Sequence, residues 1–159
     1  MNTVIIFFAK YLIGALLLTA GIFFFQQNQK VKRSALRFAV CSLPITFLLA
    51  KIASLFFYHS RPFVTGHFTP LIAHAADNGF PSDHALLSFA VAALIFSFNK
   101  KQGAMLFALG FIISFARVAA GVHSPIDIFG SFVISVTVVA AGNWIKKTSL
   151  RERTQNHLR

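Results

Sequence analysis

The sequence has very few acidic residues. It contains 4 Asp and Glu but 15 Lys and Arg among 159 residues, which gives a formal net charge of +11. Such a balance would favour nucleic acid binding if the basic residues formed a soluble patch. Here they occupy short stretches between long apolar segments, a pattern typical of loops that flank a membrane and contact anionic lipid headgroups. We therefore expect the bilayer, and not nucleic acid, to be the partner of these charges.

Cysteine is also scarce, whereas apolar residues are abundant. The single cysteine, Cys41, lies in an apolar segment, so neither an intramolecular disulfide nor a cysteine metal site can form. Apolar residues make up 56% of the chain and include 20 Phe, more than a soluble domain of this length normally carries. The composition predicts an integral membrane protein.

Five apolar segments predict an all-α, polytopic membrane bundle of about five transmembrane helices. About 20 apolar residues, rising ~1.5 Å each, cross the hydrocarbon layer. The third segment is shorter, and it spans only if its helix begins near Ser82 and the bilayer adapts. We expect the first segment to remain as a helix, because the three residues before it lack the positive charge of a signal peptide. The segments are residues 4–25, 38–58, 85–98, 103–122 and 125–145.

The positions of Lys and Arg predict the topology of this bundle. Short cytoplasmic loops collect basic residues, and here these residues gather at 30–37, 100–101 and 146–159. The C-terminus is then cytoplasmic, while the N-terminus, the 59–83 segment and the turn at 123–124 face outward. The sequence contains no internal repeat, so we expect residues 1–159 to form one domain with a polar, mobile tail at 147–159.

Groups suited to binding phosphate lie in or next to the outward segments, except Arg117, which lies within the apolar segment 103–122. Arg61 and Arg117 carry planar guanidinium groups that match phosphate oxygens bidentately. An arginine inside an apolar helix, such as Arg117, is costly and indicates function. Ser82 is placed to cap the next helix, where its hydroxyl and free backbone N–H groups, including that of Asp83, would favour an anion. These residues predict a phosphate-binding site.

Three residues are candidates for the chemistry. His123 is the predicted nucleophile, and Asp127, four residues later, is placed to hydrogen-bond its second ring nitrogen. His84 would protonate the leaving oxygen and then activate the water that hydrolyses a phosphohistidine. Asp127 also belongs to a good helix start, 124–127, and the two roles are compatible. This mechanism requires no metal and no cofactor.

Together these pieces resemble the three motifs of the type 2 phosphatidic acid phosphatase superfamily, over residues 51–131. The pieces are Arg61-Pro62, the 81–84 sequence PSDH, and Arg117 with His123 and Asp127. The resemblance implies that Arg61, Ser82 and Arg117 bind phosphate, that His84 is the acid, and that Asp127 assists the nucleophile His123. The 74–84 stretch, HAADNGFPSDH, is similar to bacitracin-resistance-type undecaprenyl-diphosphate phosphatases. That similarity implies a polyprenyl diphosphate substrate at the outer face of a bacterial cytoplasmic membrane.

Two positions depart from the family pattern. Ser54 occupies the place of the usual first-motif lysine, and Lys51 lies one helical turn earlier, from where a long side chain would still reach the phosphate. Ala116 replaces the serine that usually precedes the third-motif arginine. These departures concern phosphate affinity more than reaction type.

Other polar residues and other functions remain open. His59 and His67 have no assigned role, and His74 and Asp77 are candidate contacts to a second phosphate. Phosphatidylglycerophosphate, phosphatidate and lipid A are alternative substrates. Zinc hydrolysis through His84, His123 and Asp127, and a small transporter or proton pathway, are alternatives of other classes. The sequence does not indicate an oligomeric state.

Overall fold

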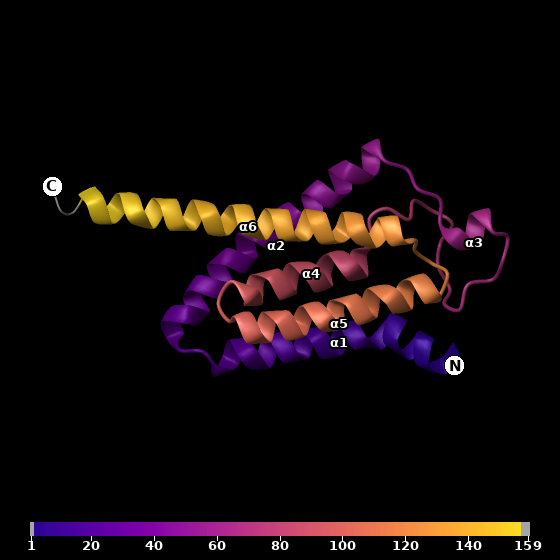
Figure 1. Ribbon diagram of the computed structural model, residues 1–159, viewed down its shortest axis with the longest axis horizontal. Helices are drawn as coiled ribbons and strands as arrows, with labels where there is room; N and C mark the ends of the chain where they lie inside the picture. Colours follow the sequence, from indigo (N-terminus) through magenta and orange to yellow (C-terminus); the bar gives the residue numbers. More distant parts are fainter. Residues whose placement is uncertain (1, 157–159) are drawn as a thin grey trace.

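The protein is a bundle of helices (Figure 1). The computed structural model describes residues 2–156, with side chains up to residue 148. The helices are α1 (Asn2–Gln26), α2 (Gln29–Phe56), α3 (Pro62–Thr65), α4 (Asp83–Phe96), α5 (Lys100–Ala119) and α6 (Pro125–Asn156). Four of them, α1, α2, α5 and α6, are long and apolar enough to cross a membrane. The predicted all-α, multi-pass class is confirmed, and α4, with 14 residues, is the short helix expected from the sequence.

Two helices extend further than the apolar segments indicated. α2 begins at Gln29 because Asn28 caps it, accepting a hydrogen bond from the backbone N–H of Val31 at 3.0 Å. The basic residues 30–37 therefore lie on a helix and not in a loop. α6 continues to Asn156, so positions 147–156, which the sequence assigned to a polar and mobile tail, are helical. Positions 143–156 contain no Gly or Pro that would end the helix. Tail positions 157–159 lie outside the described residues.

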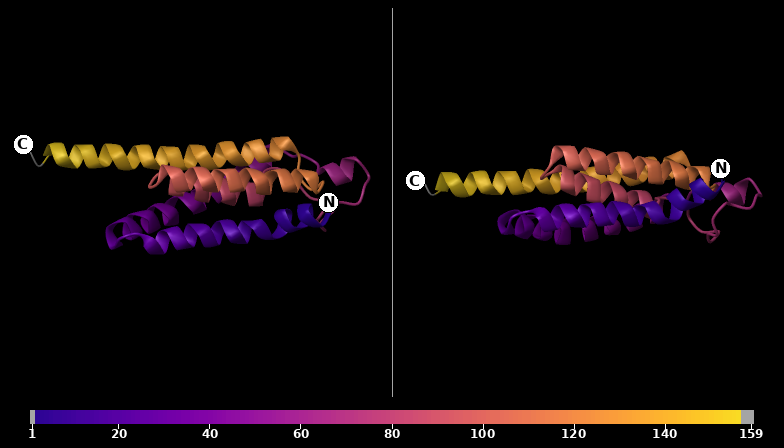
Figure 2. Two further views of the ribbon diagram at one scale, coloured as in Figure 1. Left: turned by 60° about the horizontal axis from the view of Figure 1, so that its bottom comes forward. Right: turned by 90° about the horizontal axis from the view of Figure 1, so that it is seen from below.

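The short helix α4 is the centre of the bundle. Nine of its 14 residues are buried, and it packs against α1, α2, α5 and α6. A helix that is apolar on all faces is stable only where neighbours surround it. Figures 1 and 2 show α4 enclosed in this way between the longer helices. The N-terminus of α4, which Ser82 precedes, is thus held in the middle of one end of the bundle.

The two ends of the bundle carry different residues. The N-terminus of α1, the segment around α3 and the α5–α6 turn lie at one end (Figures 1 and 2). The α1–α2 and α4–α5 turns and the end of α6 lie at the other. The candidate site residues belong to the first end, and the basic stretches 30–37, 100–101 and 146–147 belong to the second. This separation fits the predicted topology.

The contact between α4 and α5 predicts a difference between two glycines. A Cβ on Gly103 would lie 2.3 Å from the Cα of Phe96, whereas a Cβ on Gly14 in α1 would meet nothing within 4 Å. Gly103→Ala must push two backbones apart, so we expect it to destabilise the protein by about 1–3 kcal/mol. Gly14→Ala should not destabilise it. Thermal unfolding of both variants in detergent measures the difference, and equal melting temperatures would contradict the packing of this turn.

Candidate active site

The segment between α2 and α4 is fastened to the bundle by Asn78. The amide Nδ2 of Asn78 donates to the carbonyl oxygens of Ser54 and Phe57 at 3.0 and 3.1 Å. Its Oδ1 accepts from the backbone N–H of His59 at 3.0 Å, and the N–H of Gly79 donates to the carbonyl of His59 at 2.8 Å. These bonds fix the backbone on both sides of Arg61. They bring two parts of the chain into one site although about 20 residues separate them.

Arg61 is buried and every nitrogen of its guanidinium group has a partner. Nε donates to Oδ1 of Asp77 at 2.8 Å, Nη1 to the carbonyl of Val122 at 3.0 Å, and Nη2 to the carbonyl of Asn78 at 3.2 Å. Nη1 also lies 3.4 Å from Nε2 of His123. Nη1 is also 3.5 Å from Nδ1 of His123, so the guanidinium group is held beside the imidazole, near both ring nitrogens.

Asp77 has a different position from the one expected for a contact to a second phosphate. Its carboxylate pairs with Arg61, and this hydrogen bond lowers the pKa of Asp77 below its usual value. An anionic carboxylate would repel phosphate. The structure therefore makes Asp77 a residue that orients Arg61.

His123 is buried and its two ring nitrogens have different surroundings. Nδ1 lies 3.0 Å from the carbonyl oxygen of Gly79 and 3.4 Å from Oδ2 of Asp127. Because both neighbours are acceptors, we assign the proton to Nδ1, which leaves a lone pair on Nε2. Burial lowers the pKa of His123, and the positive charges of Arg117 and Arg61 lower it further, while Asp127 opposes them. Neutral pH therefore favours the nucleophilic, uncharged imidazole.

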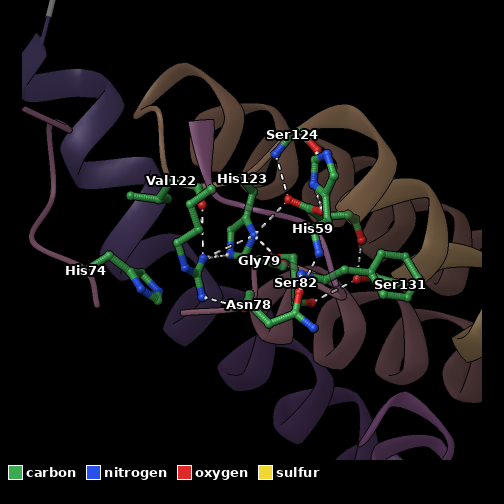
Figure 3. Close-up of polar contacts among 12 residues, drawn as sticks. His59, His74, Asn78, Gly79, Ser82, Val122, His123, Ser124 and Ser131 are labelled. Carbon is green, nitrogen blue, oxygen red and sulfur yellow. Dashed lines mark hydrogen bonds and ion pairs between the residues drawn. The ribbon is translucent and has the colours of Figure 1, made fainter. Parts of the chain in front are cut away.

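Asp127 is completely buried in the first turn of α6 and has three neighbouring donors. Its Oδ2 accepts from the backbone N–H of Ser124 at 2.8 Å, and its Oδ1 lies 2.9 Å from Nδ1 of His59 (Figure 3). Its contact with His123 is longer, at 3.4 Å. The structure thus adds His59, which the sequence left without a role, to the site. Since 68 residues separate His59 from Asp127, no local pattern indicates this pair.

Ser82 and Arg117 provide buried donors that are not used within the protein. Among the residues with described side chains, Ser82 Oγ and Arg117 Nε are buried without a hydrogen-bond partner, and Ser88, deeper in α4, is the third such group. Ser82 occupies the N-cap position of α4, but its hydroxyl makes no capping bond, which corrects the expected cap. Buried donors without partners are uncommon in native proteins and need an explanation. An anion bound by Ser82 Oγ and Arg117 Nε would give each of them a hydrogen-bond partner.

Two further histidines lie near His123. His84 is half-buried at the second position of α4, close enough to Arg117 and His123 for electrostatic interaction with both. The ring centroid of His74 lies 5.9 Å from that of His123. Burial and the nearby Arg61 charge lower the pKa of His74. His74 remains a candidate contact for the substrate, whereas His67 is exposed and has no assigned role.

Lys51 and Asp83 share a polar cleft with Arg61. The cleft has a volume of ≈ 420 Å³, and Ser54, Asp77 and Asn78 also line it. Lys51 therefore lies on the same side of the bundle as the arginine, as its position one turn before Ser54 suggested. The cleft gives a route from the surface to Arg61. A buried imidazole near two arginines and beside a carboxylate, at the end of a membrane helix bundle, is an arrangement suited to phosphoryl transfer.

Comparison with known proteins assigns the family. The model of the PAP2 superfamily matches residues 35–151. The chain is 33% identical over 137 residues to the bacitracin transport permease protein BcrC of Bacillus licheniformis, which covers 86% of this chain and 67% of the relative. It is 31% identical over 141 residues to the undecaprenyl-diphosphatase BcrC of Bacillus subtilis (strain 168), covering 87% and 71%. The chain belongs to the PAP2 superfamily and is a membrane phosphatase.

The pKa of His123 leads to a prediction for Asp127→Asn. Asp127 raises the pKa of His123 against the effect of burial, so its removal lowers that pKa further. The acid limb of the pH dependence of kcat/KM should then move to lower pH. The maximal rate should fall by about 100-fold or more, because a cationic imidazole intermediate loses its carboxylate. Phosphate release measured from pH 4 to 9 tests both effects. A limb that stays in place or moves to higher pH would contradict the assigned contact.

Proposed function

We propose that the protein hydrolyses undecaprenyl diphosphate to undecaprenyl phosphate through a phosphohistidine intermediate. The observation that carries this proposal is the pair of buried, unpartnered donors Ser82 Oγ and Arg117 Nε, at the same end of the bundle as Nε2 of His123, the nitrogen assigned no proton. A terminal phosphate bound by these donors would satisfy both of them. Its phosphorus would then be within reach of the nucleophile.

In the first step, Nε2 of His123 attacks the terminal phosphorus. The P–N bond forms and the bond from phosphorus to the bridging oxygen breaks, with undecaprenyl phosphate as the leaving group. His84 gives its proton to that oxygen. Asp127 stabilises the cationic imidazole through Nδ1, while Arg61, Arg117 and Ser82 hold the phosphoryl oxygens.

In the second step, water replaces the lipid. His84 removes a proton from the water as it attacks phosphorus, and the P–N bond breaks. Inorganic phosphate leaves and His123 returns to its neutral form. Every role in the cycle falls to side chains of this protein, so we propose that the reaction requires no metal.

The substrate proposal is supported by the name of one relative and by the 74–84 stretch of the sequence. The Bacillus subtilis relative is named for undecaprenyl diphosphate, and the 74–84 stretch resembles that type of enzyme. Lys51 and His74, on the rim of the site, are the proposed contacts to the second phosphate. The distribution of basic residues favours an active site on the outer face of a bacterial cytoplasmic membrane, where the carrier lipid would be recycled.

A transport function is the second candidate, because the Bacillus licheniformis relative is named a transport permease. A transport pathway would need polar groups along the depth of the bundle. In this structure the buried charged residues Arg61, Arg117 and Asp127 belong to the same end. That grouping favours catalysis at a surface.

A substrate panel tests the proposed specificity. We expect the purified protein, in detergent with excess chelator, to release phosphate from undecaprenyl diphosphate with a kcat/KM at least about 10-fold above that for phosphatidate, phosphatidylglycerophosphate or lipid A, a difference of ~1.4 kcal/mol in transition-state binding. Activity that is lost in chelator and restored by zinc would replace the proposed mechanism with metal-assisted hydrolysis. No activity on any prenyl diphosphate would refute the substrate.

The nucleophile is tested by trapping the intermediate. With substrate labelled at the terminal phosphorus, wild-type protein quenched in alkali should carry an acid-labile, alkali-stable label. His84→Ala should both form and lose this label more slowly, because His84 is the proposed acid of the first step and the proposed base of the second. His123→Ala should carry no label, and its turnover should be slower than that of wild type by a factor of about 1,000 or more. Retained labelling in folded His123→Ala protein would exclude His123 as the nucleophile.

A further inference from the structure

His59 is closer to Asp127 than the nucleophile is. Its Nδ1 lies 2.9 Å from Oδ1 of Asp127 and 3.2 Å from the hydroxyl of Ser124, whereas Nδ1 of His123 lies 3.4 Å from Oδ2. The carboxylate of Asp127 is completely buried, and the His59 side chain is 34% exposed. His59 therefore lies between solvent and the buried carboxylate, with one ring nitrogen directed at Asp127.

The orientation of His59 is set by contacts on both its backbone and its ring. Its N–H and carbonyl are bound by Asn78 and Gly79. Its ring stacks on Phe57, with a centroid separation of 6.1 Å and an interplanar angle of 10°. A Cβ on Gly79 would lie 3.1 Å from the His59 carbonyl and 3.2 Å from Oδ2 of Asp127, so these groups are packed closely. The ring has little freedom to turn away from the carboxylate.

We infer that His59 is a positioning residue for the reaction proposed above, holding one oxygen of Asp127 so that the other faces Nδ1 of His123. The hydrogen bond between Nδ1 of His59 and Oδ1 of Asp127 leaves the negative charge of Asp127 available to the cationic imidazole of the intermediate. This inference depends on the proposed phosphatase mechanism.

The charged groups around His59 are few. Asp127 faces it from α6, and on its own segment Arg61 follows two residues later, paired with Asp77. His123 lies across the carboxylate. Two histidines thus share one carboxylate, each contacting a different oxygen.

Two substitutions separate positioning from simple packing. His59→Asn places an amide nitrogen the same number of bonds from the backbone as Nδ1, so it keeps a donor. His59→Phe keeps a planar ring against Phe57 and removes the donor. With undecaprenyl diphosphate in detergent, we expect His59→Phe to lower kcat by about 10- to 100-fold with KM changed less than about threefold. We expect His59→Asn, which retains the donor, to keep kcat within about threefold of wild type.

The matched control is His67→Asn, on an exposed histidine of the same segment whose positive φ of 51° suits asparagine. It should match wild type in kcat, KM and pH profile. Equal kcat for His59→Phe and wild type, or a kcat for His59→Asn as low as that of His59→Phe, would overturn the inference. If His59→Phe fails to fold, His59→Ala replaces it as the variant without the donor. Hydrolysis by wild type and its loss in His123→Ala establish the phosphatase mechanism separately from either result.

Discussion

The site is organised around one buried negative charge. Taking a carboxylate out of water is costly unless donors surround it, and Asp127 is completely buried. Its neighbouring donors are the backbone N–H of Ser124, Nδ1 of His59 and Nδ1 of His123, the proposed nucleophile. Satisfying this carboxylate therefore requires the segment between α2 and α4 to fold back onto the start of α6. The same fold places Arg61 beside His123.

Two serines on α6 connect this site to the core of the bundle. The hydroxyl of Ser131 donates to the carbonyl oxygens of Ser82 and Asp127 at 2.9 and 2.8 Å, and the hydroxyl of Ser135 donates to the carbonyl of Leu86 at 2.8 Å. Small hydroxyl residues let two membrane helices approach closely and bond across their interface. These bonds tie the start of α4, where Ser82 lies, to the first turns of α6, where Asp127 lies.

Much of this arrangement was accessible from the sequence because membrane helices and phosphate chemistry leave local signals. Long apolar segments predicted the spanning helices, and an arginine in the apolar segment of α5 indicated a buried partner. Contacts between distant segments left no such signal. The pairing of His59 with Asp127 and of Asp77 with Arg61 depends on how the irregular segment 57–82 folds, which Asn78 determines through bonds to Ser54 and Phe57. The unused Ser82 hydroxyl was missed for a related reason, since an N-cap position predicts a local bond.

Arg61 and Arg117 are both buried, but Arg61 pairs with the carboxylate of Asp77, whose side chain is 62% exposed. Dissolved ions screen a charge pair that reaches the surface and hardly reach a buried one. Salt at the membrane surface would therefore weaken the pair of Arg61 and Asp77 and leave the buried contact between Asp127 and His123 unchanged. If Arg61 binds phosphate as proposed, substrate binding depends on ionic strength more than the reaction at His123 does.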